Sequence, residues 1–232
     1  LQGTRVKFVK GTAVSLDRGT KQVKTTDGEA LDYDKLLLAL GNVTNYFGIE
    51  GLREHSFGIK STEEAEAFKQ HLHKQFIDNG CPDLNYVIVG GGPTGIELAG
   101  ALPGYLQDII KKHGAEKCKL NISLVEAAPK LLPRSPTKVS RTVTKRLRSL
   151  GIKLYLGQAV KGQTADTLMI GDMPIKSRTV IWTAGVANNP FFVANNFTMT
   201  DRGKVQVNEL LEAEPDICVL GDNASTMYSG MA

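Results

Sequence analysis

Cysteine is scarce in this sequence, and the spacing of the few cysteines excludes two kinds of site. The three, Cys81, Cys118 and Cys218, lie far apart and form neither a CxxC motif nor a metal-ligand spacing. Such scattered thiols argue against a disulfide framework and fit a reducing, intracellular compartment. The four histidines are also dispersed, so we expect no metal site.

Long apolar runs and a strong charge of one sign are missing as well. No uninterrupted stretch approaches the ~18 residues that a membrane span needs, and no signal peptide is visible. The net charge of +4 is mild for 232 residues and is spread along the chain, which gives no case for nucleic acid. The one basic segment, residues 138–148, carries apolar residues at helical spacing and is typical of a solvated outer helix. The composition therefore predicts a soluble globular protein.

The most informative stretch is rich in glycine. A short apolar strand at residues 86–89 runs into the pattern Gly90-x-Gly92-x-x-Gly95, and apolar residues at helical spacing follow. This is the order that a dinucleotide pyrophosphate site requires, although an ordinary strand-helix turn can share it. Gly90 would permit the turn, Gly92 would let the backbone approach the pyrophosphate, and Gly95 would let the helix pack closely. The predicted NAD(H) loop comprises Gly90, Gly91, Gly92, Pro93, Thr94, Gly95 and Ile96.

Glu126 closes the next predicted strand. A carboxylate there can accept both adenosine ribose hydroxyls and repels the 2′-phosphate of NADP, which favours NAD(H). Its separation from Gly95, 31 residues, is longer than the usual ~20. We attribute the surplus to a polar loop and to a helix kinked or broken at Pro103–Gly104. The alternative is that Glu126 is a plain surface acid at the end of a strand. Lys130 and Arg134 lie nearby in the sequence, so NADPH as the cofactor stays open.

Residues 152–189 repeat the pattern of residues 5–45, which indicates an internal repeat. In each copy, short alternating strands with glycine turns, which start at residues 6–9 in the first copy and at residue 152 in the second, precede a continuous apolar strand that ends in glycine and is expected to be buried. Gly41 ends this strand in the first copy, and Ala184 with Gly185 ends it in the second; all three are candidate cofactor contacts, although strand termination alone would also explain the glycines. Only the second copy follows a glycine loop. We therefore expect a duplicated nucleotide-binding domain whose first loop is missing from the amino end.

A helix is predicted over residues 61–79, between the two copies. Ser61 and Glu64 match a capping box at its start. Its apolar stripe would consist of Ala65, Phe68, Leu72 and Phe76.

Two further acids are candidates for the chemistry. Glu97, just inside the helix after the glycine loop, is either a first-turn acid favoured by the helix dipole or a catalytic residue near the nicotinamide. Asp222 follows Gly221 at the end of a strand, where its carboxylate could hold a sugar or ribityl hydroxyl or form an Asx turn. Trp182, inside an apolar strand, is expected in the core.

Five segments spread over nearly the whole chain resemble the type II NADH dehydrogenases, which belong to the flavoproteins with two dinucleotide-binding domains. They are residues 90–100, 124–129, 181–186, 221–224 and 38–49. The first four patterns are typical of this pyridine nucleotide-disulfide oxidoreductase-like superfamily as a whole. Residues 44–48, Thr-Asn-Tyr-Phe-Gly, point more narrowly to the type II group.

The resemblance implies an α/β fold in which a Rossmann-like NAD(H)-binding domain with a β-meander is inserted into an incomplete FAD-binding domain of the same type. The NAD(H) domain would span residues 61–189, and the FAD domain residues 1–60 and 190–232. Hydride would pass from NADH to FAD and electrons on to a quinone.

The same resemblance implies roles for three residues. Gly41 would lie near the flavin, Asp222, with Gly221 before it, at the ribityl chain, and Glu97 at the nicotinamide-flavin contact.

Two parts of the family pattern are absent from the sequence: the amino-terminal FAD glycine loop and the carboxyl-terminal segment that attaches to the membrane. We therefore expect a soluble fragment, truncated at both ends, that binds NADH but holds FAD poorly or not at all and could itself be inactive. The full-length protein would be intracellular, at the membrane surface, and could form a homodimer.

Two other functions stay open. One is an NAD(P)H-dependent disulfide or sulfide reductase of the same superfamily, although the lack of CxxC excludes the thioredoxin-reductase arrangement. The other is a non-catalytic NAD(H)-binding module.

Overall fold

The computed structural model describes residues 3, 5–78, 85–114 and 120–226, and the chain divides into two compact units. The first unit comprises Leu1–Val43 with Ala187–Ala232, and the second comprises Thr44–Val186. These limits differ from the expected boundaries at residues 60 and 189. Residues 44–60 group with the second unit because Tyr46 and Leu52 are buried in its core.

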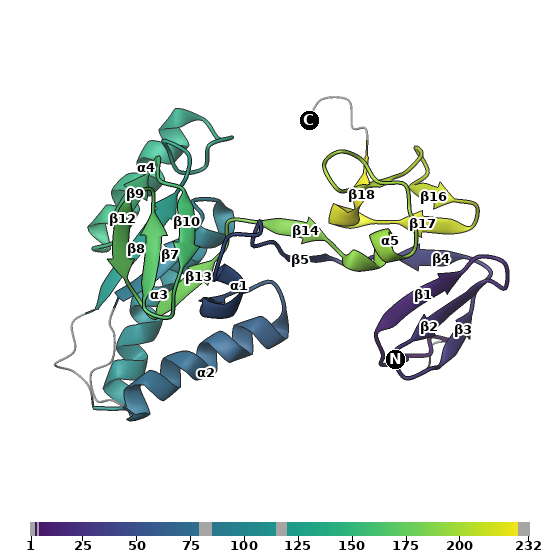
Figure 1. Ribbon diagram of the computed structural model, residues 1–232, viewed down its shortest axis with the longest axis horizontal. Helices are drawn as coiled ribbons and strands as arrows, with labels where there is room; N and C mark the ends of the chain where they lie inside the picture. Colours follow the sequence, from purple (N-terminus) through teal and green to yellow (C-terminus); the bar gives the residue numbers. More distant parts are fainter. Residues whose placement is uncertain (1–2, 4, 79–84, 115–119, 227–232) are drawn as a thin grey trace. The chain divides into compact units, whose positions relative to one another are not determined.

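A five-stranded parallel sheet forms the centre of the second unit (Figure 1). Its order is β6-β13-β7-β8-β9. The strands are β6 (Ser56–Phe57), β13 (Thr179–Trp182), β7 (Asn85–Val89), β8 (Asn121–Glu126) and β9 (Lys153–Leu156). Parallel neighbours need crossover connections, and helices α3 (Pro93–Lys112) and α4 (Thr137–Ser149) supply two of them.

Both faces of this sheet are covered. Tyr86 and Ile88 of β7 face a cluster that includes α2 (Thr62–Asp78), α3 and α4. Val87 and Val89, which alternate with them, pack on the other face with Leu168 of an antiparallel β-meander and with Leu52 of α1 (Leu52–His55). The meander consists of β10 (Val160–Gln163), β11 (Thr167–Ile170) and β12 (Met173–Lys176). The sheet is therefore buried on both sides, as continuous apolar strands predict.

Helix α2 begins with the predicted capping box. The backbone N–H of Glu64 donates to Ser61 Oγ at 3.1 Å, and the N–H of Ser61 donates to Glu64 Oε2 at 3.2 Å. Glu64 also accepts bonds from the N–H of Lys60 at 2.6 Å and the hydroxyl of Thr44 at 2.9 Å. Three residues of the predicted stripe, Phe68, Leu72 and Phe76, are buried. Ala65 is exposed, so its place in the stripe was predicted wrongly, because it lies in the first turn beyond the packed region.

We expect Glu64→Ala to destabilise the second unit by about 2 kcal/mol, since several donors lose their acceptor together. Glu66→Ala, two positions later and exposed, is the matched control and should change the free energy of unfolding by less than about 0.5 kcal/mol. Urea unfolding of both variants measures this, and equal effects would contradict the account.

We expect His71 of α2 to make the stability of the second unit depend on pH. Its Nε2 lies 2.9 Å from Thr179 Oγ1, and burial lowers the pKa of the ring. The unfolded chain therefore binds the proton more readily, so stability should fall as the pH drops below about 6.5. We expect His71→Gln to flatten this part of the profile in thermal unfolding at pH 5 to 8; an unchanged slope would show that other groups cause it.

Helix α3 is continuous for 20 residues and includes Pro103, so Pro103–Gly104 does not break the helix; a kink there, the other expectation, stays a prediction. Leu102, Leu106 and Ile109 are almost fully buried on the sheet, and this packing outweighs the hydrogen bond that the proline removes. The long helix itself accounts for much of the distance between Gly95 and Glu126.

The first unit contains three small sheets. Strands β1 (Ala13–Asp17), β2 (Gln22–Thr25) and β3 (Ala30–Asp32) form an antiparallel meander. Strand β4 (Leu36–Leu38) pairs in parallel with β17 (Ile217–Val219), and β16 (Glu212–Glu214) completes that sheet. Strands β15 (Val205–Gln206) and β18 (Ala224–Ser225) pair separately, and the short helices are α5 (Pro190–Ala194) and η1 (Gly221–Asn223).

The predicted repeat is confirmed in most of its elements. Each copy holds a three-stranded meander followed by a parallel strand, and the first pairing of each meander is irregular, near Ala13 in one and near Val160 in the other. After the parallel strands come β5 (Asn42–Thr44) and β14 (Val186–Asn188), which pair with each other.

Two details of the first copy were predicted wrongly. Residues 6–9 form no strand, and Phe8 is 74% exposed, because no described strand pairs with them as β8 pairs with β9. The apolar strand before Gly41 is only three residues long and is not buried throughout, since Leu37 is 61% exposed while Leu38 is 4% exposed.

Candidate nucleotide-binding site

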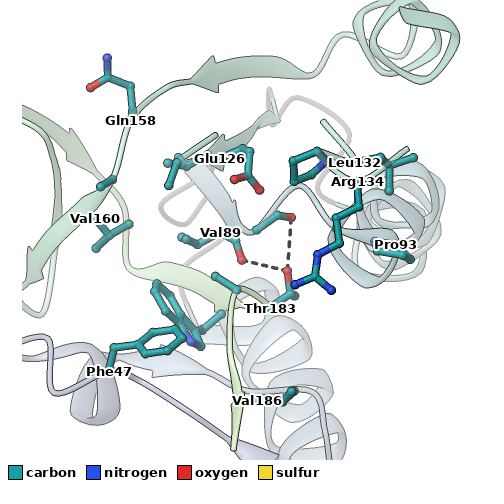
Figure 2. A pocket seen from close by; sticks show the side chains of 18 of the residues that line it. Phe47, Val89, Pro93, Glu126, Leu132, Arg134, Gln158, Val160, Thr183 and Val186 are labelled. Carbon is teal, nitrogen blue, oxygen red and sulfur yellow. Dashed lines mark hydrogen bonds between the residues drawn. The ribbon is translucent and has the colours of Figure 1, made fainter. Parts of the chain in front are cut away.

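A cavity of about 820 Å³ lies in the second unit, at the carboxyl ends of β7, β8 and β13 (Figure 2). This is the edge of a parallel sheet at which ligands bind in open α/β folds. Five of the predicted cofactor contacts line it: Gly90, Gly92, Pro93, Glu126 and Ala184. Gly91, Thr94, Gly95 and Ile96 belong to the same loop and helix but do not line it.

The glycine loop folds as its spacing predicts. Gly90 directly follows β7 and has φ +119°, a conformation that favours glycine. A Cβ on Gly95 would come within 1.9 Å of the carbonyl oxygen of Gly90 and 2.7 Å of Thr183 Oγ1. Only glycine at this position lets the helix approach the strand so closely.

Gly92 differs from its neighbours because no packing constraint acts on it. It has φ −79° and ψ −178°, which any residue adopts, and a Cβ there would meet nothing within 4 Å. It lines the cavity at the start of α3, where free N–H groups and the helix dipole favour an anion. The open space over Gly92 therefore fits a pyrophosphate.

Two backbone N–H groups hold the Glu126 carboxylate. Gly91 donates to Oε2 at 2.6 Å and Ala128 donates to Oε1 at 2.7 Å. In Figure 2 the carboxylate points into the cavity. Each oxygen keeps a further lone pair, so Glu126 can accept two ribose hydroxyls without rearranging.

Gly185 has a packing role that the sequence did not reveal. A Cβ there would lie 2.4 Å from Phe47 Cε2 and 2.6 Å from the carbonyl oxygen of Asn45. Its neighbours Ala184 and Val186 line the cavity, whereas Gly185 does not. A direct contact of Gly185 with a cofactor stays a prediction.

Glu97 is exposed on the first turns of α3 and does not line the cavity. Its catalytic role stays a prediction. Trp182 is 4% exposed, donates through Nε1 to Asn45 at 2.7 Å, and also forms part of the cavity wall, so it is a core residue as expected.

The candidate flavin residues come together in the first unit. The parallel strands β4 and β17 end side by side, with Leu38 opposite Val219. Beyond these ends, Asn42 donates to the carboxylate of Asp222 at 2.9 Å, and Asn223 donates to the carbonyl of Gly41 at 2.8 Å. Gly41 and Gly221 have φ +66° and +65°. Their role toward a flavin stays a prediction.

Sequence reasoning missed two residues of the site. Thr183 donates to the carbonyl of Val89 at 2.8 Å and lies under the glycine loop. Phe47 lines the cavity with φ +53°, uncommon for an aromatic residue. A signal existed for both: Thr183 directly follows the strand that neighbours β7, and Phe47 lies in the segment 44–48 that resembles the type II group.

Two kinds of feature are absent from the part of the chain that the structure describes. It contains no group of three or more histidine, cysteine, aspartate or glutamate side chains that could hold a metal ion. In the same residues, every helix is too short or too polar to cross a bilayer.

The chain is similar in sequence to known proteins over almost its whole length. The family model described as pyridine nucleotide-disulphide oxidoreductase matches residues 1–231. A type II NADH:quinone oxidoreductase of Staphylococcus saprophyticus is 27% identical, and the match covers 97% of this chain and 59% of that relative. This chain thus spans about three fifths of the length of the curated relatives it matches.

Solved structures share the fold. NDH2 from Plasmodium falciparum in complex with NADH has a TM-score of 0.76 at 21% identity, covering 93% of this chain and 50% of that one. The ferredoxin reductase for the CYP199A2 system from Rhodopseudomonas palustris has a TM-score of 0.77 at 20% identity, with coverages of 93% and 50%. With the family model matching almost every residue, the chain belongs to the pyridine nucleotide-disulphide oxidoreductase family.

Proposed function

We propose that the protein is a flavin-dependent NADH dehydrogenase, which takes hydride from NADH and passes electrons through FAD to a quinone. The observation that carries the proposal is the cavity of the second unit, in which a glycine cradle at Gly92 and an anchored Glu126 line one wall. The similarity to NADH:quinone oxidoreductases supports the choice of reaction.

The residues of the cavity support one placement of NADH. Its pyrophosphate would rest over Gly92 and the start of α3, because that is the one open stretch of the loop. Its adenosine ribose would bind Glu126, whose charge disfavours a 2′-phosphate. The nicotinamide would then extend toward the carboxyl end of β13, where Ala184 lines the cavity.

FAD would be held by the first unit. Gly41 leaves room for a flat ring because a Cβ there would meet nothing within 4 Å, and Asp222 presents an exposed carboxylate for a ribityl hydroxyl. When bound, a flavin supplies an acceptor for two electrons that can release them singly or together. Glu97 would act where nicotinamide and flavin meet.

The proposed partners follow from the relatives. A membrane quinone would place the full-length protein at the membrane surface, and a homodimer is compatible with this arrangement. A disulfide or sulfide reductase of the same family is the second candidate, and the similarity to NADH:quinone oxidoreductases favours the quinone as acceptor.

The test is turnover of NADH by the full-length protein with a soluble quinone, together with the visible absorbance of flavin. The proposal expects both a flavin spectrum and quinone reduction. Flavin-free protein, or protein that oxidises NADH only with a disulfide, would overturn it, and NADH binding without any turnover would favour the non-catalytic module.

A further inference from the structure

We propose that Arg134 binds the pyrophosphate of the dinucleotide from the turn that lies beside the glycine loop. The inference rests on the proposed binding of NADH in this cavity and adds a residue that the glycine motif does not include. Four observations carry it: the charges in the cavity, the rigid turn that holds Arg134, the strain in that turn, and the direction of the side chain.

The cavity has only two charged residues among those that line it, Glu126 and Arg134. Glu126 is already fixed by two N–H donors, whereas Arg134 forms no hydrogen bond or ion pair with any other residue that the structure describes. A pyrophosphate brings two negative charges into a largely apolar space, and α3 begins with Pro93, which has no N–H to offer. A second source of positive charge is therefore needed, and Arg134 is the one cation that the described lining supplies.

A tight turn presents Arg134 to the cavity. The N–H of Ser135 donates to the carbonyl of Leu132 at 2.8 Å, which closes a four-residue turn with Pro133 and Arg134 at its centre. Proline favours the first central position of such turns. Lys130 Nζ donates to the carbonyl of Ser135 at 3.0 Å and ties the far end of the turn.

The turn is also fastened to the glycine loop. The N–H of Leu132 donates to the carbonyl of Gly91 at 2.9 Å. Leu131, which is fully buried, packs against Gly91 so closely that a Cβ on Gly91 would lie 2.7 Å from Leu131 Cδ2. Leu132 has φ +47°, a conformation that costs a residue with a Cβ about 1 kcal/mol or more. Such strain at a cavity wall is typical of a segment held in place for a ligand.

The side chain of Arg134 extends over the cavity. Figure 2 shows its guanidinium on the side where Thr183 and Pro93 lie, and not on the side of the Glu126 carboxylate. A guanidinium fork matches phosphate oxygens in a bidentate manner. Arg134 is thus placed for the pyrophosphate over Gly92 and not for a group on the ribose beside Glu126.

The experiment compares four ligands by NMR titration of the chain: adenosine, ADP-ribose, NADH and NADPH. Arg134→Gln should raise the Kd of ADP-ribose and of NADH about tenfold. The Kd of adenosine should not change, because adenosine has no phosphate. Arg134→Lys keeps the charge without the fork and should have a smaller effect. Arg141→Gln, an exposed arginine of α4, makes the same change of charge and should alter nothing.

Three results would overturn the inference. Unchanged binding of NADH and ADP-ribose would show that Arg134 does not reach the pyrophosphate. A loss confined to NADPH would mean that it binds a 2′-phosphate instead, and an equal loss for adenosine would mean that it only shapes the wall. Failure of the unmodified chain to bind any of the four would instead overturn the proposed function itself.

Discussion

Replacing Gly92 by alanine should leave the fold intact and raise the Kd for NADH about thirtyfold. The backbone at Gly92 already has a conformation that alanine adopts, and the added Cβ would meet no atom of the protein within 4 Å. We therefore expect the free energy of unfolding to change by less than about 0.5 kcal/mol. The Cβ would instead enter the space assigned to the pyrophosphate, at a cost to binding of about 2 kcal/mol.

Gly95→Ala is the matched contrast, since it makes the same chemical change three residues along the chain. There the Cβ would lie 1.9 Å from a backbone oxygen, so α3 must move away from β7. We expect a loss of about 3 kcal/mol of stability, with binding lost as a consequence. Thermal unfolding and NADH titration of both variants separate the two effects; a destabilised Gly92→Ala, or one that binds NADH normally, would contradict the assignment.

Glu126→Gln should weaken the binding of NADH about thirtyfold. It should also shift the ratio of the affinities for NADH and NADPH about a hundredfold toward NADPH. The first effect arises because a charged acceptor of ribose hydroxyls becomes a neutral one. The second adds the loss of repulsion toward the 2′-phosphate. Glutamine is preferred to alanine for this test because its amide oxygen can still accept one of the two backbone bonds from Gly91 and Ala128.

Glu66→Gln is the control for Glu126→Gln. Glu66 is exposed on α2 and does not line the cavity, so the variant makes the same change of charge away from the site. It should leave both affinities unchanged. If Glu126→Gln weakened the binding of NADH and of NADPH equally, the carboxylate would support the loop through its bond to Gly91 and would not select the cofactor.

Local sequence predicted the parts of this protein that depend on local geometry. The order of strand, glycine loop and helix predicted the positions of Gly90 and Gly95, because the turn at Gly90 and the approach of Gly95 to the carbonyl of Gly90 are set within a few residues. The capping box of Ser61 and Glu64 was equally clear. The repeat could be seen because both meanders use turn glycines at similar spacing.

Other features depend on contacts between distant segments, and the sequence could not reveal them. Pro103 lies inside an unbroken α3 because burial of the helix outweighs its local preference. Gly185 must be glycine because the ring of Phe47, far away in sequence, fills the space beside it. The limits of the second unit, with Thr44 at its start, follow from the burial of a segment that carries no local sign of a boundary.

The role of Arg134 belongs to this second group. In the sequence it is one basic residue among several, and only the turn from Leu132 to Ser135 distinguishes it. The same holds for Thr183, whose importance lies in its contact with the loop around Gly90.

The most direct test of the central claim, that NADH binds over the glycine loop of the second unit, is the amide NMR spectrum of the labelled chain during titration with NADH. The account predicts that the largest shifts fall on the N–H groups of Gly92, Thr94 and Gly95 and on the segment after Glu126. Shifts confined to other parts of the chain, or a spectrum that NADH leaves unchanged, would contradict it.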